Sequence, residues 1–246
     1  IMHRSLPKNG VIKTATIIRK NSGKCYVNFA IEVPKEDFFE ISKTAGNCKA
    51  VGIDLGLESF ITLSDGAKIE PPHFFKKKQK KLRREQQKLS RKQEAHKAAT
   101  KAANKGRSSD ERKIILPKSA NYKKQARKVA KLHEKIANQR KDFDYQLAHK
   151  LVNEIDNIAC ENLSPKFMIA NRKLSKAAND AGFSKFKTIL EYEAFKHQTK
   201  VVFVDPKFTT QDCFFCRNRI KKDLSERVHE CHYCGVIIDR DVNAAI

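Results

Sequence analysis

The chain has 246 residues, and its 51 lysine and arginine residues outnumber its 28 aspartate and glutamate residues, which gives a formal net charge of +23. Hydrophobic residues make up 40% of the chain and phenylalanine alone contributes 15 residues, so a folded core can form and a wholly disordered basic protein is excluded. A compact state with this charge repels itself unless a polyanion neutralises it, so nucleic acid is the first partner to consider.

The apolar runs are only a few residues long, as at 201–204, so we expect no transmembrane helix and no membrane partner. The chain starts at Ile1 without a signal-peptide pattern and stops at Ile246 in what resembles the start of a helix. We therefore expect a sequence truncated at both ends. Seven cysteines, an odd number, without a secretory signal indicate a reducing compartment such as the cytoplasm, where close cysteine pairs bind metal.

Short strands open the chain. Residues 11–33 alternate weakly around a turn at Gly23 and predict a β-hairpin that ends at Pro34. Residues 35–48 are typical of a linker. Three further short strands separated by turn residues predict an antiparallel meander over 51–56, 60–63 and 67–69.

The composition changes sharply over residues 73–142, which hold 25 lysine and arginine residues against 6 aspartate and glutamate residues. One helix is expected from about Lys76 to Ala103, and a second starts near Ala120. Within the second helix, apolar residues recur at helical spacing: Ala126, Val129, Leu132, Ile136, Phe143, Leu147 and Leu151. The pattern predicts a helical hairpin with a narrow apolar seam and a cationic outer face, which favours contact with phosphate backbones over a merely solvated surface.

Two buried strands and a helix are expected after this insertion. The strands cover 157–163 and 201–204, and the helix covers 184–198. The helix residues expected to point inward are Phe186, Ile189, Leu190 and Phe195. Strands that alternate with helices predict an α/β sheet covered by helices.

Asp54 lies in an apolar strand between Gly52 and Gly56. A carboxylate there is unfavourable to bury unless it binds a metal or accepts good hydrogen bonds, and the glycines would allow a ligand or phosphate to approach the backbone. An ordinary aspartate of a strand-end turn is the alternative.

Three more carboxylates invite comparison with Asp54. Glu161 ends an apolar strand, although it could simply face water, and Asp239 and Asp241 precede an alanine-rich helix start, where aspartate is a common cap. Together such carboxylates suit hard divalent cations, and two Mg²⁺ ions about 4 Å apart can clamp the attacking and leaving oxygens of a phosphodiester.

Two Cys-x-x-Cys pairs give the strongest local signal. Each pair turns two thiolates toward one ion, and two pairs complete a tetrahedral zinc site that is closed and therefore structural. His229 and His232 are close enough in sequence to replace a ligand, but we expect both to be exposed. The four predicted zinc ligands are Cys213, Cys216, Cys231 and Cys234.

In this order, the motifs resemble the transposon-encoded OrfB group, the TnpB family, which is related to the type V RNA-guided CRISPR nucleases. The resemblance covers nearly the whole chain. The matching segments are 52–56, the basic hairpin with 138–143, 161–163, 190–192, 204–206, 209–213, the two cysteine pairs and 239–245.

The resemblance implies an α/β RNase H-like (RuvC) fold with a mixed sheet, a basic helical-hairpin insertion and a C-terminal zinc ribbon. It further implies an endonuclease that cuts DNA with Mg²⁺ or Mn²⁺, with guide RNA from the transposon end and target DNA as partners. By position, Asp54, Glu161 and Asp241 match the catalytic carboxylates, with Asp239 as the substitute for the third. The expected parts are the tail of a β-barrel-type domain and a linker at 1–48, a RuvC-like core at 49–208 with the hairpin at 73–142, a zinc ribbon at 209–236 and a last RuvC-like segment at 237–246.

The sequence departs from the family pattern at Arg217, where the family usually has glycine, and residues 94–119 look longer than the usual hairpin. Three other functions stay open. A remnant without catalysis could act as an accessory protein that binds RNA or DNA. A transposase that joins strands could use the same triad. An actin-like ATPase or sugar kinase shares the Gly-Ile-Asp-Leu-Gly motif, but nine glycines with no late cluster argue against its adenosine site.

Overall fold

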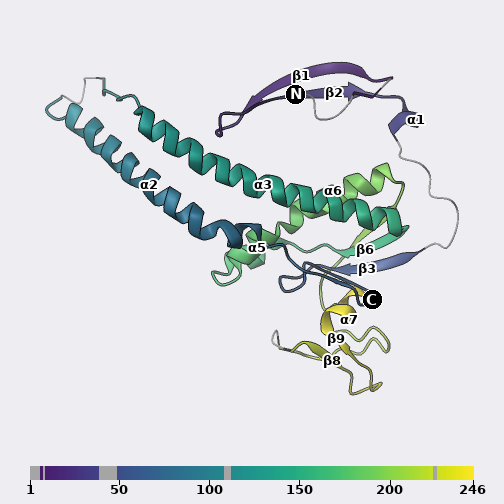
Figure 1. The fold of residues 1–246 in the computed structure, drawn as a ribbon. Coiled ribbons are helices and arrows are strands. Elements are labelled where there is room, and N and C mark those ends of the chain that lie inside the picture. Colours follow the sequence, from purple (N-terminus) through teal and green to yellow (C-terminus); the bar gives the residue numbers. More distant parts are fainter. Residues whose placement is uncertain (1–5, 8, 39–48, 108–111, 224–225) are drawn as a thin grey trace. The chain divides into compact units, whose positions relative to one another are not determined.

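The computed structural model describes residues 6–7, 9–38, 49–107, 112–223 and 226–246 (Figure 1). The chain forms two compact units, one made of 1–32 with 74–140 and the other of 33–73 with 141–246. The predicted linker begins with one helical turn, α1 (Lys35–Phe38), and its remaining residues, 39–48, lie outside the described residues. No helix among the described residues is both long and apolar enough to cross a membrane.

The first unit contains the predicted N-terminal hairpin. Strands β1 (Val11–Arg19) and β2 (Cys25–Glu32) pair in antiparallel fashion. Gly23 in their turn has a φ of 90°, a left-handed conformation that glycine adopts without a steric penalty. The Tyr26 hydroxyl donates a hydrogen bond of 2.8 Å to Oε1 of Glu134, which ties this hairpin to the basic helices of the same unit.

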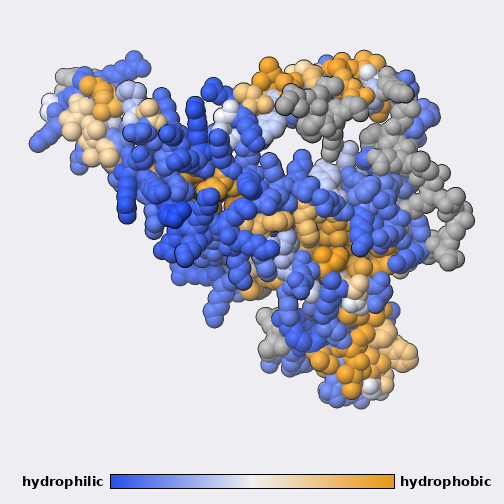
Figure 2. Space-filling view, viewed as in Figure 1, coloured by the Kyte–Doolittle hydropathy of each residue, from blue (hydrophilic) through white to orange (hydrophobic). Residues whose placement is uncertain are grey.

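The basic segment forms the two predicted helices, α2 (Phe74–Ala103) and α3 (Ala120–Glu154), which run antiparallel and side by side (Figure 1). Alanine, lysine, glutamine and arginine dominate both, and all are strong helix formers. Val129 and Ile136 of α3 are buried in the seam between them, as their helical spacing predicts, and Leu82 of α2 packs there with them. The side chains seen around this seam are mostly hydrophilic (Figure 2).

A five-stranded mixed sheet forms the centre of the second unit, with the strand order β5-β4-β3-β6-β7. The predicted meander is confirmed, since β3 (Ala50–Asp54), β4 (Ile61–Leu63) and β5 (Lys68–Ile69) are antiparallel. On the other side, β6 (Asn157–Glu161) and β7 (Lys200–Val204) run parallel to β3. Parallel pairing brings the carboxyl ends of β3 and β6 to the same edge of the sheet.

Helices cover one face of this sheet. The last part of α3 and α6 (Phe183–Lys196) contribute to one buried apolar cluster with the strands. Phe60 lies within it, and its ring centroid is 5.3–5.7 Å from those of Phe143, Phe183 and Phe186. Two short helices that the sequence did not predict, α4 (Pro165–Ala170) and α5 (Ser175–Ala181), precede α6.

Two burial predictions are wrong. Phe195 of α6 is 61% exposed, and β7 is not a buried strand, because Val202 and Val204 are 45% and 39% exposed. The register pairs Gly52, Ala159 and Val202 across three neighbouring strands. This places them on one face of the sheet, and the face is left partly open at Ala159 and Val202.

The C-terminal segment adds a two-stranded ribbon and a short helix. Strands β8 (Val228–Glu230) and β9 (Ile237–Asp239) are antiparallel, and β9 leads directly into α7 (Arg240–Ala245). Helix α7 contacts β3 and β4, so the end of the chain packs against the central sheet.

Candidate active site and metal centre

Two of the predicted carboxylates meet at the carboxyl edge of the sheet. Asp54 is the last residue of β3 and Glu161 the last residue of β6. The parallel register pairs Ile53 with Cys160, so the next residue of each strand falls beside the other. Both side chains belong to buried residues, which are 8% and 5% exposed. The edge therefore concentrates two acidic groups where water has little access.

Helix α7 brings Asp241 near this edge, close enough for its charge to act there. It can approach β3 closely because Gly52 has no side chain: a Cβ there would lie 1.7 Å from the carbonyl oxygen of Ala245. The charge of Asp241 acts on both Asp54 and Glu161. The predicted role of Gly52 in admitting a ligand is thus replaced by a role within the protein, since the backbone that approaches it belongs to α7.

Burial and crowding weaken the acidity of this group. Burial, followed by the charges of Glu161 and Asp241, raises the pKa of Asp54 to about 8. Burial also raises the pKa of Glu161, against the hydrogen bonds from Thr209 and Asp54, which act to lower it. Like charges gathered in a buried site disfavour ionisation, so these carboxyl groups hold their protons more tightly than exposed ones do.

Asp239 has other partners. Its Oδ1 accepts hydrogen bonds from the backbone N–H groups of Asp241 and Val242 and so caps α7. Its Oδ2 lies 2.7 Å from Nζ of Lys68. Capping and ion pairing occupy both oxygens of Asp239, whereas Asp241 is the aspartate of this segment whose charge acts on the buried pair.

Three residues to which sequence analysis gave no role support the carboxylates. The Thr209 hydroxyl donates a hydrogen bond of 2.5 Å to Oε1 of Glu161. Arg240 donates from Nε and Nη2 to Oδ1 of Asp241 at 3.1 and 3.0 Å. Asn243 is buried, and its Nδ2 donates to the carbonyl oxygens of Thr209 and Asp212. All three lie in segments that carry the family resemblance, but their sequence context gave no sign of their partners.

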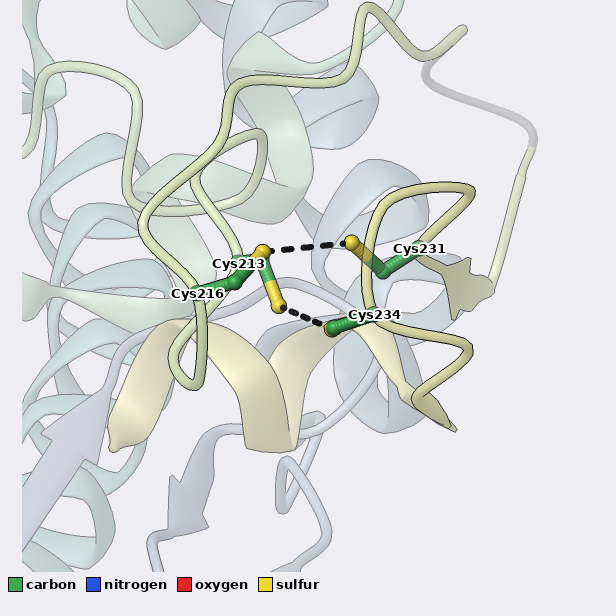
Figure 3. A group of neighbouring side chains, drawn as sticks. All are labelled: Cys213, Cys216, Cys231 and Cys234. Atoms are coloured by element: carbon green, nitrogen blue, oxygen red, sulfur yellow. Dashed lines mark hydrogen bonds between the residues drawn. The ribbon is translucent and has the colours of Figure 1, made fainter.

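The four predicted cysteines converge from two loops (Figure 3). The Sγ atoms of Cys216 and Cys231 are 3.4 Å apart, and those of Cys213 and Cys234 are 3.7 Å apart. A disulfide needs about 2.05 Å, whereas a tetrahedral ion with Zn–S bonds of about 2.3 Å separates its sulfurs by about 3.8 Å. The spacing fits one metal ion with four thiolate ligands.

Proton affinity differs within this cluster. A backbone hydrogen bond from Asn218 lowers the pKa of Cys216 to about 6. A hydrogen bond from Val236 acts in the same direction on Cys234, but burial and the neighbouring sulfurs raise the pKa of Cys234 to about 12. Four thiolates cannot share this space without a cation, so metal binding must release protons here.

The two cysteine loops have the same backbone geometry. The residue after the second cysteine is left-handed in both, with φ of 63° at Arg217 and 74° at Gly235. Each of these residues donates its N–H to the carbonyl oxygen of the first cysteine of its pair, at 2.9 and 2.8 Å. The conformation explains why glycine suits this position, and it makes Arg217 a strained substitute.

The histidines of the ribbon differ from expectation in one case. His232 is exposed, as expected, but His229 is fully buried. Burial and the charge of Lys222 lower the pKa of His229. It is a neutral core residue of the ribbon and does not belong to the cysteine cluster.

A cationic groove runs along the start of α3 in the first unit. Because one helix face carries the charges, phosphate groups of a nucleic acid backbone are the ligands that suit it. Its cationic lining residues are Lys123, Lys124, Arg127, Lys128 and Lys131.

Comparisons with known proteins agree with the resemblance seen in the sequence. The OrfB_IS605 model, described as "Probable transposase", matches residues 28–113 and 106–172. The model described as "Cas12f1-like, TNB domain" matches residues 183–246. Together the two models account for most of the chain.

Curated relatives include a "Putative RNA-guided DNA endonuclease" of Streptomyces pristinaespiralis, 32% identical over 244 residues, which cover 98% of the present chain and 53% of the relative. "Putative RNA-guided DNA endonuclease InsQ" of Escherichia coli K12 is 29% identical over 253 residues, which cover 96% of the present chain and 56% of the relative. The chain thus spans about half the length of the curated relatives it matches.

Among solved structures, a chain of a "CRISPR-Cas12f Ternary Complex" aligns with a TM-score of 0.51 and 17% identity, over 91% of the present chain and 41% of that one. This likeness shows a Cas12f-like fold with a mixed sheet and covering helices.

Proposed function

The chain belongs to the OrfB_IS605 family, and from that premise we propose that it is the nuclease part of a transposon-associated, RNA-guided DNA endonuclease. The catalytic core is an RNase H-like (RuvC) domain at 49–208, completed by the segment at 237–246. The basic hairpin at 73–142 is an insertion in this core, the zinc ribbon occupies 209–236, and residues 1–48 are the tail of a β-barrel-type domain with its linker.

One observation carries the proposal: Asp54, Glu161 and Asp241 act on one another's charge at the carboxyl edge of the sheet, where burial raises the pKa of Asp54. Two buried carboxylates with a third acid acting on them destabilise a fold unless they serve a ligand. Their carboxylate oxygens are the kind of ligand that Mg²⁺ or Mn²⁺ prefers, and the relatives named above are each a "Putative RNA-guided DNA endonuclease".

The carboxylates would hold two divalent cations, which when bound supply activation of water and stabilisation of the leaving 3′ oxygen. Asp54 would give up its proton as the site fills, because its raised pKa keeps it protonated otherwise. Thr209 orients Glu161 through its hydroxyl, and Arg240 fixes the carboxylate of Asp241. These two residue pairs would hold the carboxylates of Glu161 and Asp241 in place before any substrate arrives.

The remaining parts serve folding and binding. The four cysteines would hold structural Zn²⁺, since their sulfur spacing fits a tetrahedral site and leaves no open position. The cationic groove on α3 would contact phosphate groups of guide RNA and target DNA. Recognition of the target sequence would rest on base pairing with the guide.

A cleavage assay tests the catalytic assignment. The chain is purified with the RNA it acquires in the expressing cell and incubated with labelled single- and double-stranded DNA and Mg²⁺ or Mn²⁺. Asp54→Asn keeps the shape of the side chain and removes its charge, while Glu154→Ala removes an exposed carboxylate at the end of α3 and serves as the matched control.

We expect cutting that needs the metal and disappears in Asp54→Asn, while Glu154→Ala cuts normally. Nucleic-acid affinity should stay nearly unchanged in Asp54→Asn, because the substitution removes none of the cationic side chains that would contact phosphate. Equal loss of cutting and of binding in Asp54→Asn would refute the catalytic role. Tight, salt-sensitive binding by the unmodified chain without any cutting would instead support a catalytically inactive accessory protein.

A further inference from the structure

A second group of metal-ligating side chains lies away from the carboxylates and cysteines described above. His149 belongs to α3, Glu193 belongs to α6, and His197 directly follows α6. One ligand atom of each lies within 4.8 Å of the others. Among the described residues, this group and the four cysteines are the sets of three or more histidine, cysteine or acidic residues whose ligand atoms all lie within 4.8 Å of one another. Asp54, Glu161 and Asp241 are not such a set, so an ion shared by those carboxylates would have to draw them closer together.

The distances in this group suit a shared ion better than direct hydrogen bonds. Nδ1 of His149 is 3.5 Å and Nε2 of His197 is 3.9 Å from the same carboxylate oxygen, Oε2 of Glu193. Hydrogen bonds between such atoms measure about 2.7–3.2 Å. A tetrahedral ion with bonds of about 2.0–2.1 Å separates its ligands by about 3.3–3.4 Å, so only a small adjustment would place all three around one ion.

Burial and helix geometry support the same conclusion. Glu193 and His197 have side chains only 7% and 10% exposed, and they are four residues apart, which places them on one helix face. His149 is 51% exposed and approaches from α3, with its ring 5.0 Å from that of His197 at 73°. The buried carboxylate calls for a positive partner, and the exposed edge of His149 offers an ion a path to it and room for a water ligand.

We propose that His149, Glu193 and His197 form a second metal site that binds one transition-metal ion such as Zn²⁺. Two imidazoles and one carboxylate favour zinc, cobalt or nickel over Mg²⁺, which prefers oxygen ligands. The ion would fasten α3 to α6, the two helices that contribute to the apolar cluster of the second unit. The site is independent of the proposed nuclease and would stabilise the fold whether or not the chain cuts DNA.

Cobalt distinguishes this site from the cysteine cluster. The full chain is first loaded with Zn²⁺ and freed of weakly held metal, so that zinc stays on the four thiolates, and is then titrated with Co²⁺. Cobalt bound to thiolates shows a sulfur-to-metal charge-transfer band, whereas cobalt bound to imidazole and carboxylate shows only the weaker ligand-field bands. We expect about one Co²⁺ per chain without the charge-transfer band, and a melting temperature that rises as it binds.

The variant His149→Ala removes an exposed ligand, so the fold should persist, and the zinc retained by the cysteines reports that it does. Its cobalt affinity should fall at least about tenfold. The matched control is His133→Ala, which removes another exposed histidine of the same helix and should bind cobalt normally. Glu193→Gln, which keeps the size of the side chain, should also weaken cobalt binding. Unchanged affinity in His149→Ala, or an equal loss in His133→Ala, would overturn the proposal.

Discussion

The contact between Gly52 and helix α7 gives a sharp test of how the fold builds the candidate active site. The substitution Gly52→Ala adds a Cβ 1.7 Å from the carbonyl oxygen of Ala245, whereas ordinary contact begins at about 3.4 Å. Either β3 or α7 must therefore move by well over 1 Å. Strand β3 is held in place, because Gly52 donates its N–H to Oγ of Ser64 at 3.1 Å and accepts from the N–H of Ser64 at 3.0 Å. The helix that carries Asp241 is the part that yields.

Two effects of different size follow from this displacement. Overpacking of a core costs about 1–3 kcal/mol, and the smaller freedom of the unfolded chain with alanine offsets about 0.4–1 kcal/mol of it. We expect the free energy of unfolding to fall by about 1–2 kcal/mol. A shift of about 1 Å at a reacting centre costs about a hundredfold in rate, so cutting should fall about a hundredfold or more.

The assay measures both effects on the same preparations. Urea denaturation gives the free energy of unfolding, and cutting is measured at a temperature at which the variant is fully folded. Gly66→Ala is the control, because its Cβ would meet nothing within 4 Å, while its φ of 89° strains alanine and so lowers stability without touching α7. This control should lose stability but cut at the normal rate per folded molecule. A folded Gly52→Ala protein that cuts as fast as the unmodified chain would refute the argument that this glycine positions Asp241.

Three further predictions concern single side chains. Arg217→Gly should raise the free energy of unfolding by about 0.5–1 kcal/mol, because the left-handed backbone there costs a non-glycine residue about 1–2 kcal/mol and the greater freedom of glycine in the unfolded chain cancels part of the gain. In urea denaturation of the zinc-loaded protein, Gly235→Ala should lower the free energy of unfolding. A change of the same sign in both variants would contradict the explanation. Asn243→Ala removes hydrogen bonds to Thr209, Asp212 and Phe214 and should lower the free energy of unfolding by about 2–3 kcal/mol in the same urea assay. A loss below about 0.5 kcal/mol would show that these hydrogen bonds do not stabilise the fold. Because the pKa of Asp54 is raised in the folded chain, the unfolded chain releases this proton at lower pH, so stability without added divalent cations should fall as pH rises from about 4 toward 8. Urea titrations at pH 5 and 8 should show a smaller decline in Asp54→Asn, with the remainder due to Glu161, whose pKa is also raised. An unchanged decline in this variant would contradict the role given to Asp54.

Local patterns were enough to predict the N-terminal hairpin, the strands of the central sheet, the helical hairpin and the cysteine cluster, but not the two strands of the C-terminal ribbon. Val129 and Ile136 lie at helical spacing in α3 and are buried together, because helix periodicity decides which face of an amphipathic helix is apolar. The two cysteine pairs converge because each tight loop turns its own thiolates inward. In both cases the information lies within a few residues of the chain.

Tertiary packing decided what the sequence left open or misjudged. Phe195 looks like a core residue by type, yet it is exposed. Gly52 looks like a ligand-binding glycine, yet it accommodates α7. His229 has no local feature that marks it as buried, and the approach of His149 to Glu193 depends on how α3 and α6 pack. Such contacts join residues far apart in the sequence, so no local pattern can encode them.

The C-terminal ribbon that carries the four cysteines is directly connected to two of the candidate catalytic carboxylates. Thr209, at the entrance to the ribbon, holds Glu161 by its hydroxyl. At the exit, β9 passes directly into α7, which carries Asp241. Asn243 of α7 closes the connection, because it accepts a hydrogen bond from the N–H of Phe214, the residue after the first cysteine. A metal ion on the four thiolates would fix the two ends of this segment against each other, so the ribbon would set the position of two of the three carboxylates without contacting the reaction.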